Sequence, residues 1–261
     1  MYWKYGIAIE QRGLTGPEAL NYIPVVRMQL GWIDDTDVGK LLFRAIAREI
    51  LSAAPANLAA FSGTAQPGEP TRGVLVQPFL RGTCNAAARA AVASYTPWLQ
   101  GPCDHLWSSP VLNRGFLPHE LLFHELVHTL RDAAGHGNRR ARLTGALWKF
   151  KNLEEFAAVL TTNIFMSDPT NGRADKTGLR KDHHTGRLEN EFADSLGFYK
   201  LSAGVFPNID QFCTEDPWFT SRLAEVPSTF NPIHAYYHNR AEARKNSASP
   251  QAAARDANPP A

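Results

Sequence analysis

The chain has 261 residues, of which 44% are hydrophobic and 20% are charged, and its formal net charge is +2. This composition is typical of a folded globular protein and excludes long disorder over most of the chain. The balanced charge, without any lysine- and arginine-rich run, argues against nucleic acid as a partner. No stretch approaches about 18 consecutive apolar residues, so we expect no membrane span.

The N-terminus does not have the pattern of a cleaved signal peptide. Charged Lys4 and Glu10 interrupt it, and no long apolar core ends in a small-residue cleavage site. If the protein acts outside its cell, something other than such a signal must carry it. The three cysteines do not make a disulfide framework; a Cys84–Cys103 bridge can form, and the odd count leaves at least one thiol free.

The first half of the chain predicts strands around one helix. Residues 22–30 are rich in β-branched side chains and predict a strand, and Asp37 opens a predicted helix whose apolar residues recur at three and four. The Gly- and Pro-containing residues 63–72 predict a loop. Two further short or edge strands are predicted at residues 73–80 and 107–112.

The second half predicts helices. One runs from Pro118 to a stop at Gly135, and another follows Asn152 and ends near Asp168. Weaker helical patterns lie at residues 188–196 and 217–225. We therefore expect an α+β protein with a small mixed sheet and a mostly helical second half. Residues 1–240 are expected to form a single domain, and the small, polar residues 241–261 a disordered tail.

Residues 124–128 read His-Glu-Leu-Val-His, which is an HExxH motif. On a helix, residues four apart share a face, so the imidazoles of His124 and His128 can reach one metal ion. Glu125 lies near the same face. The apolar neighbours favour a helix that packs on a core, whereas the alternative interpretation is a solvated helix with incidental histidines.

The motif indicates a specific chemistry. A zinc ion with three protein ligands keeps a fourth position for water, lowers the pKa of that water to about 7 and polarises a carbonyl. A carboxylate beside the water takes its proton and passes it to the leaving amine. We therefore predict one zinc ion per chain, with Glu125 as the catalytic base.

A third zinc ligand is expected downstream of the motif. The longer HExxHxxGxxH form is excluded, because Arg131 and Ala134 stand where that form needs glycine and histidine, and glycines flank His136. Residues 152–159 predict a helix with two adjacent glutamates, and a glutamate packed against the HExxH helix gives a His₂Glu site.

Glu154 and Glu155 each have a structural alternative. Asn152 followed by Glu155 matches a capping box, and the helix dipole favours acids in a first turn. The spacing alone therefore leaves open which of the two glutamates binds the metal.

HELVH followed by NLEEFAAVLTTNIF resembles the gluzincin-type zinc proteases, and in character it is similar to secreted bacterial effector and toxin proteases. Lethal-factor-type toxins carry the ligand glutamate in an N-x-x-E-F-x-A context, which matches Asn152, Glu155, Phe156 and Ala158. The run TTNIFMSDPTNGRADKTGLRKDHH also resembles metallopeptidase effectors, including VgrG-linked effectors of type VI secretion. The resemblance covers residues 118–184 and implies a zincin fold with His124, His128 and Glu155 as zinc ligands.

The chain departs from the lethal-factor pattern at two positions. Trp148 stands where those proteins have a tyrosine, and Val159 stands where they have a second glutamate. When water attacks the peptide bond, the carbonyl oxygen becomes negatively charged and is then called the oxyanion. Another hydrogen-bond donor must stabilise this oxygen, or zinc acts alone. The candidates are His184, Tyr237 and, after them, His234. Their alternatives are an exposed loop around His184 and aromatic packing around Tyr237.

These features predict a zinc-dependent endopeptidase, delivered as a bacterial effector or toxin, with a protein or peptide as substrate. The resemblance implies a secretion-system carrier and an immunity protein as further partners. The strand predicted at residues 107–112 could bind substrate backbone by β-augmentation. Two alternatives are a zinc amidase that acts on cell-wall peptide and a non-catalytic binding domain with a structural zinc, which would have a closed four-ligand site.

Overall fold

The computed structural model of the chain describes residues 4–11, 15–52, 74–77, 92–94, 117–136, 143, 150, 152–171, 178–181 and 186–257. These residues are mostly helical. The chain divides into two compact units, of which the first is Met1–Asp35 with Leu42–Gly137 and the second is Thr36–Leu41 with Asn138–Ala261. The two units subdivide the region predicted as one domain over residues 1–240.

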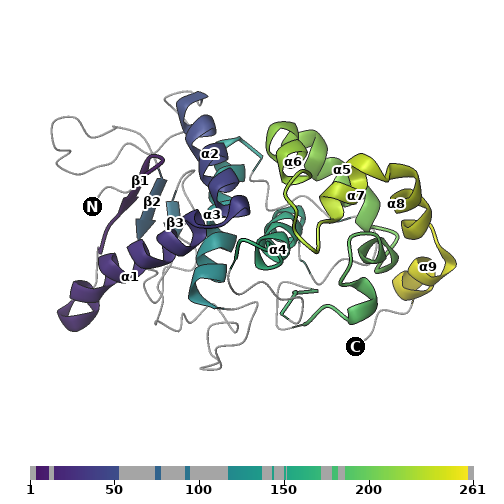
Figure 1. Cartoon of the computed structure of the whole chain (residues 1–261), viewed down its shortest axis with the longest axis horizontal. Helices are drawn as coiled ribbons and strands as arrows, with labels where there is room; N and C mark the ends of the chain where they lie inside the picture. Colours follow the sequence, from purple (N-terminus) through teal and green to yellow (C-terminus); the bar gives the residue numbers. More distant parts are fainter. Residues whose placement is uncertain are drawn as a thin grey trace. The chain divides into compact units, whose positions relative to one another are not determined.

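Among its described residues, the first unit contains three short parallel strands (Figure 1). β1 (Ile7–Ile9) pairs with β2 (Val74–Gln77), and β2 pairs with β3 (Val92–Ser94). β2 lies within the strand predicted over residues 73–80, whereas β1 and β3 have no counterpart in the sequence predictions. Because both pairings are parallel, the described strands do not form the mixed sheet that we expected.

α1 (Gly16–Asp34) includes residues 22–30, so the strand predicted there is wrong. The fully buried side chains of α1 are Tyr22, Val26, Leu30 and Ile33. Their spacing of three and four residues is that of one helix face. Burial of this face outweighs the strand preference of the β-branched residues, which is weak and depends on context.

α2 (Asp37–Ser52) and α3 (Pro118–Ala133) confirm the helices predicted from Asp37 and Pro118. Proline suits the first turn of α3, because its missing N–H would have no partner within the helix. Oε2 of Glu120 accepts the backbone N–H of Leu117 at 2.9 Å. α1 and β3 both pack against α3 within the first unit.

α3 ends where the glycine predicts. Gly135 has a φ of 81°, a left-handed conformation in which glycine carries no Cβ penalty. The N–H of Gly135 donates to the carbonyl of Asp132, and the N–H of His136 donates to the carbonyl of Arg131 at 2.8 Å. These two bonds are a Schellman motif, which closes the helix after Ala133.

α4 (Leu153–Met166) confirms the helix predicted after Asn152 and is buried along almost its whole length. Its Phe156 lies edge-on to Phe150, with ring centroids 5.2 Å apart, and stacks on Phe198 at 6.5 Å. Phe198 lies edge-on to Phe230 at 5.4 Å. These four aromatic side chains are buried and belong to the core of the second unit.

The remaining helices in the described part of the second unit are short (Figure 1). They are η3 (Asn190–Phe192), η4 (Gly197–Lys200), α5 (Val205–Glu215), α6 (Pro217–Leu223), α7 (Pro232–His238), α8 (Arg240–Ser247) and α9 (Pro250–Ala257). α6 confirms the helical pattern at residues 217–225, whereas the pattern at residues 188–196 yields only the 3₁₀ helix η3.

α8 and α9 show that the disordered tail predicted over residues 241–261 is wrong as far as residue 257. Ala243 and Ala252 are fully buried. Oγ of Ser247 donates to the carbonyl of Ala203 at 3.0 Å and accepts the N–H of Phe206 at 3.3 Å. The many small residues of this segment look like a low-complexity sequence. Their small side chains let α8 and α9 pack closely on the rest of the second unit.

Some predictions fall outside the described residues. They are the loop at residues 63–72, the strand at residues 107–112 and the Cys84–Cys103 bridge. Cys213 is described, and it is a buried free thiol. Within the described part of the chain, no helix has both the length and the hydropathy needed to cross a membrane.

Candidate metal centre

His124 and His128 lie one turn apart on α3, and both side chains are buried. Their Nε2 atoms are 3.2 Å apart, and the two ring planes are nearly perpendicular at 88°. Two ligands that each lie about 2.05 Å from a tetrahedral zinc ion are roughly 3.3 Å from each other. The two nitrogens are therefore spaced like two corners of a zinc coordination tetrahedron.

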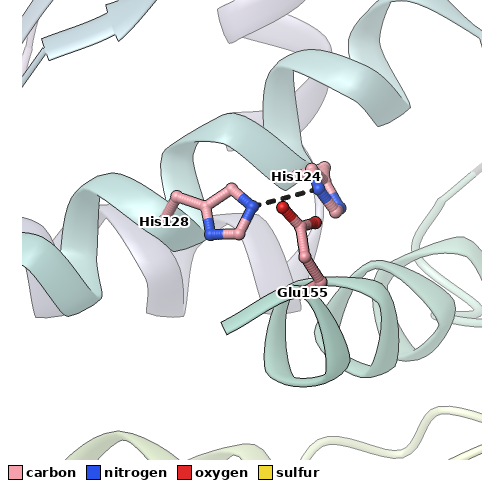
Figure 2. A group of neighbouring side chains, drawn as sticks. All are labelled: His124, His128 and Glu155. Atoms are coloured by element: carbon pink, nitrogen blue, oxygen red, sulfur yellow. Dashed lines mark hydrogen bonds between the residues drawn. The ribbon is translucent and has the colours of Figure 1, made fainter. Parts of the chain in front are cut away.

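Glu155 of α4 joins this pair. One ligand atom from each of His124, His128 and Glu155 lies within 4.8 Å of the other two, and we name these three residues the His–Glu group. Figure 2 shows the carboxylate of Glu155 directed toward the two rings. Two imidazoles and a carboxylate are a common zinc donor set, so the residues present fit this metal. The structure brings together all three predicted ligands.

The start of α4 positions Glu155. Oδ1 of Asn152 accepts the backbone N–H of Glu155 at 2.9 Å, which confirms the predicted helix cap. The cap uses the backbone of Glu155, whereas metal binding would use its side chain, so the two roles are compatible. The positive end of the helix dipole also favours a negatively charged carboxylate in this turn.

Glu154 is the alternative ligand, and the geometry favours Glu155 over it. The side chain of Glu154 is 1% exposed and is not part of the His–Glu group. Successive residues on an α-helix point about 100° apart, so two adjacent glutamates do not face the same ion equally.

Glu125, the predicted base, lies on α3 directly after His124. It is half-buried, whereas both histidines are buried. Its backbone carbonyl accepts the hydroxyl hydrogen of Thr129 at 2.9 Å, a bond within the helix. Glu125 is not part of the His–Glu group, as the role of a base rather than a ligand requires.

For two of the predicted oxyanion donors, the structure gives partners within the second unit. His184 and Trp148 lie outside the described residues. The hydroxyl of Tyr237 is 3.1 Å from that of Thr220, and burial raises the pKa of the Tyr237 phenol. Nδ1 of His234 lies 2.9 Å from the carbonyl oxygen of Ala224. Their role in oxyanion stabilisation stays a prediction.

Three features of its own residues indicate this centre: the HExxH spacing, the 3.2 Å separation of the two imidazole nitrogens and the capped glutamate of α4. Comparisons with protein-family models, with curated proteins and with solved structures found no match.

Proposed function

We propose that this protein is a zinc-dependent endopeptidase. The observation that carries the proposal is the His–Glu group, which combines the two histidines of an HExxH motif with a glutamate from a second helix. Three protein ligands leave one coordination position open for water or substrate, whereas a structural zinc site is closed by four. The donor set therefore favours a hydrolase over a binding domain with a structural zinc.

In this proposal, His124, His128 and Glu155 would hold the zinc ion. When bound, such an ion polarises a peptide carbonyl and brings the pKa of a water molecule to about 7. Glu125 accepts a proton from the attacking water and then gives it to the nitrogen of the leaving amine. His184 and Tyr237 are the proposed oxyanion donors.

The zincin-like α+β fold is part of the same proposal. Parallel strands and the HExxH helix occur together in the first unit, and a second buried helix supplies the glutamate, which supports it. A protein or peptide substrate, export by a secretion system as an effector or toxin, and an immunity protein as a partner are also proposed. Their support is the resemblance of residues 118–184 to effector metallopeptidases.

The test compares proteome-wide cleavage by the full chain with cleavage by Glu125→Gln. We expect both proteins to fold and to hold one zinc ion per chain, and the variant to lose cleavage by about 10²–10⁴-fold, the usual contribution of a positioned acid–base group. A folded chain that takes up no added zinc would contradict the proposal. Equal cleavage by the two proteins would exclude Glu125 as the base, and hydrolysis confined to cell-wall peptide would identify an amidase.

A further inference from the structure

α7 carries a second pair of histidines with the four-residue spacing of the HExxH pair. His234 and His238 lie one turn apart, with ring centroids separated by 4.4 Å and ring planes tilted by 35°. Both side chains are exposed. Residues with this spacing share one helix face, so the two rings can offer nitrogens to one ion at the protein surface.

The hydrogen bonds of the two rings determine which nitrogens are available. Nδ1 of His234 lies 2.9 Å from the carbonyl oxygen of Ala224, and Nε2 of His238 lies 2.9 Å from Oε1 of Glu225. A carbonyl and an ionised carboxylate only accept hydrogen bonds, so both of these ring nitrogens donate. In the neutral rings, the lone pairs therefore lie on Nε2 of His234 and Nδ1 of His238.

Histidines that bind metals are oriented in the same way. Such a histidine almost always donates its other ring N–H to a carboxylate, a backbone carbonyl or water, which fixes its tautomer and ring orientation. Here Ala224 supplies the carbonyl and Glu225 the carboxylate. Two adjacent residues of one short segment thus orient both rings.

Asn231 fastens that segment to the start of α7. Its side chain is buried, and its Oδ1 accepts the backbone N–H of His234 at 3.1 Å. Its Nδ2 donates to the carbonyl of Leu223 at 2.8 Å and to that of Val226 at 3.2 Å. The backbone of the segment that carries Ala224 and Glu225 is therefore held in place before any ligand binds, which lowers the cost of binding.

We propose that His234 and His238 form a second site, for a divalent transition-metal ion such as Zn²⁺. Ala224 and Glu225 orient the rings, and water completes the coordination. Imidazole is a preferred ligand of zinc, copper and nickel. With two protein ligands instead of three, this site binds zinc more weakly than the His–Glu group. The proposal does not depend on the proposed peptidase function.

The test is a calorimetric titration of Zn²⁺ into the full chain. We expect a tight event at the His–Glu group and a weaker event at α7. His238→Ala should weaken only the second event, by at least about 10-fold, and Glu225→Gln should weaken it by about 10–100-fold, as the loss of an orienting partner does. His136→Ala, which removes a histidine elsewhere, is the matched control and should leave both events unchanged.

His124→Ala separates the two proposals, because it should abolish the tight event and leave the weaker one. If the wild-type chain shows no tight event but does show a weaker event that depends on His238, only the peptidase proposal is contradicted. The second site is overturned if there is no weaker event, or if that event persists in the double variant His234→Ala/His238→Ala. Thermal unfolding in the presence of a chelator checks the fold of each variant. If the double variant does not fold because His234 is needed, the single variant His238→Ala decides the test.

Discussion

At the residue scale, two adjacent glutamates lie in the first turn of α4, and only Glu155 belongs to the His–Glu group. We predict that Glu155→Ala weakens zinc binding by more than about 100-fold, beyond the loss typical of an orienting partner, because it removes a direct ligand. Glu154→Ala, or Glu154→Gln if the buried position does not tolerate alanine, should bind zinc like the wild type. Competition with a chromophoric chelator measures both affinities, and the reverse pattern would assign the ligand to Glu154.

Buried weak acids in the second unit predict a loss of stability in alkali. Burial raises the pKa of the Cys213 thiol to about 12, from an ordinary value of 9.0, and also raises the pKa of the Tyr199 phenol. Both groups hold their protons more tightly in the folded than in the unfolded chain. Their contribution to the free energy of unfolding is therefore complete at a pH below the pKa that each group has in the unfolded chain. It falls as the pH rises above that pKa, by up to about 1.4 kcal/mol per group and pH unit.

Urea unfolding between about pH 8 and pH 10.5, which spans the ordinary pKa values of these groups, measures this effect. We expect the free energy of unfolding to decrease across the range, and to decrease less steeply in Cys213→Ala, which lacks the thiol. A free energy of unfolding that does not change with pH would contradict the assignment of these groups as buried and protonated.

The residue patterns that could be predicted are local. The HExxH spacing places two histidines on one helix face whatever surrounds it, and Asn152 caps the helix that it precedes. The contact between His238 and Glu225 could not be predicted in this way, because it depends on the backbone path from α6 to α7. The same holds for the hydroxyl of Tyr237, whose partner Thr220 lies on another helix.

At the element scale, α1 shows why propensity misleads. Ile23, Val25 and Val26 favour strands, yet the helix forms because Tyr22, Val26 and Leu30 bury one continuous face. α3 and α4 are predictable because their signals agree: proline or asparagine at the start, helical spacing through the middle and, for α3, glycine at the end. Each of these signals depends on neighbouring residues rather than on distant contacts.

The C-terminal helices provide a stability prediction. Removing residues 241–261 deletes the buried Ala243 and Ala252 and the hydrogen bonds of Ser247 to the second unit. Each buried hydrogen bond left unmade costs about 1–3 kcal/mol, so we expect the midpoint of thermal unfolding to fall by roughly 5 °C or more. Removing only residues 258–261 is the matched control. An unchanged midpoint in the longer truncation would restore the interpretation of this segment as a disordered tail.

At the scale of the whole molecule, the helical character of the second half follows from the sequence, whereas the sheet does not. β1, β2 and β3 pair in parallel across long stretches of sequence, from Ile7 to Val74 and from Leu75 to Val92. A three-residue strand carries too short an alternation to be identified alone, and its register depends on a partner far away in the chain. This explains why the sequence predicts neither β1 nor β3 and why it does not predict that the strands pair in parallel.

Metal binding gives the whole chain a further testable property. A ligand that binds only the folded state stabilises it by about 2.7 kcal/mol at a free concentration of 100 times Kd. We predict that a chelator lowers the unfolding midpoint of the zinc-loaded, dialysed chain by roughly 5–10 °C. His124→Ala should unfold at the same temperature with and without the chelator. A chelator effect of equal size in both proteins would show that the stabilising ion is bound elsewhere.

Asn231 has a consequence for the chemical ageing of the protein. Its side chain both accepts and donates hydrogen bonds, and an aspartate there would set a negative charge against the carbonyls of Leu223 and Val226. Deamidation makes that change when the backbone nitrogen of the next residue attacks the side-chain amide. The next residue is Pro232, whose nitrogen carries no hydrogen, so this route is closed at the position that holds α7 to the segment before it.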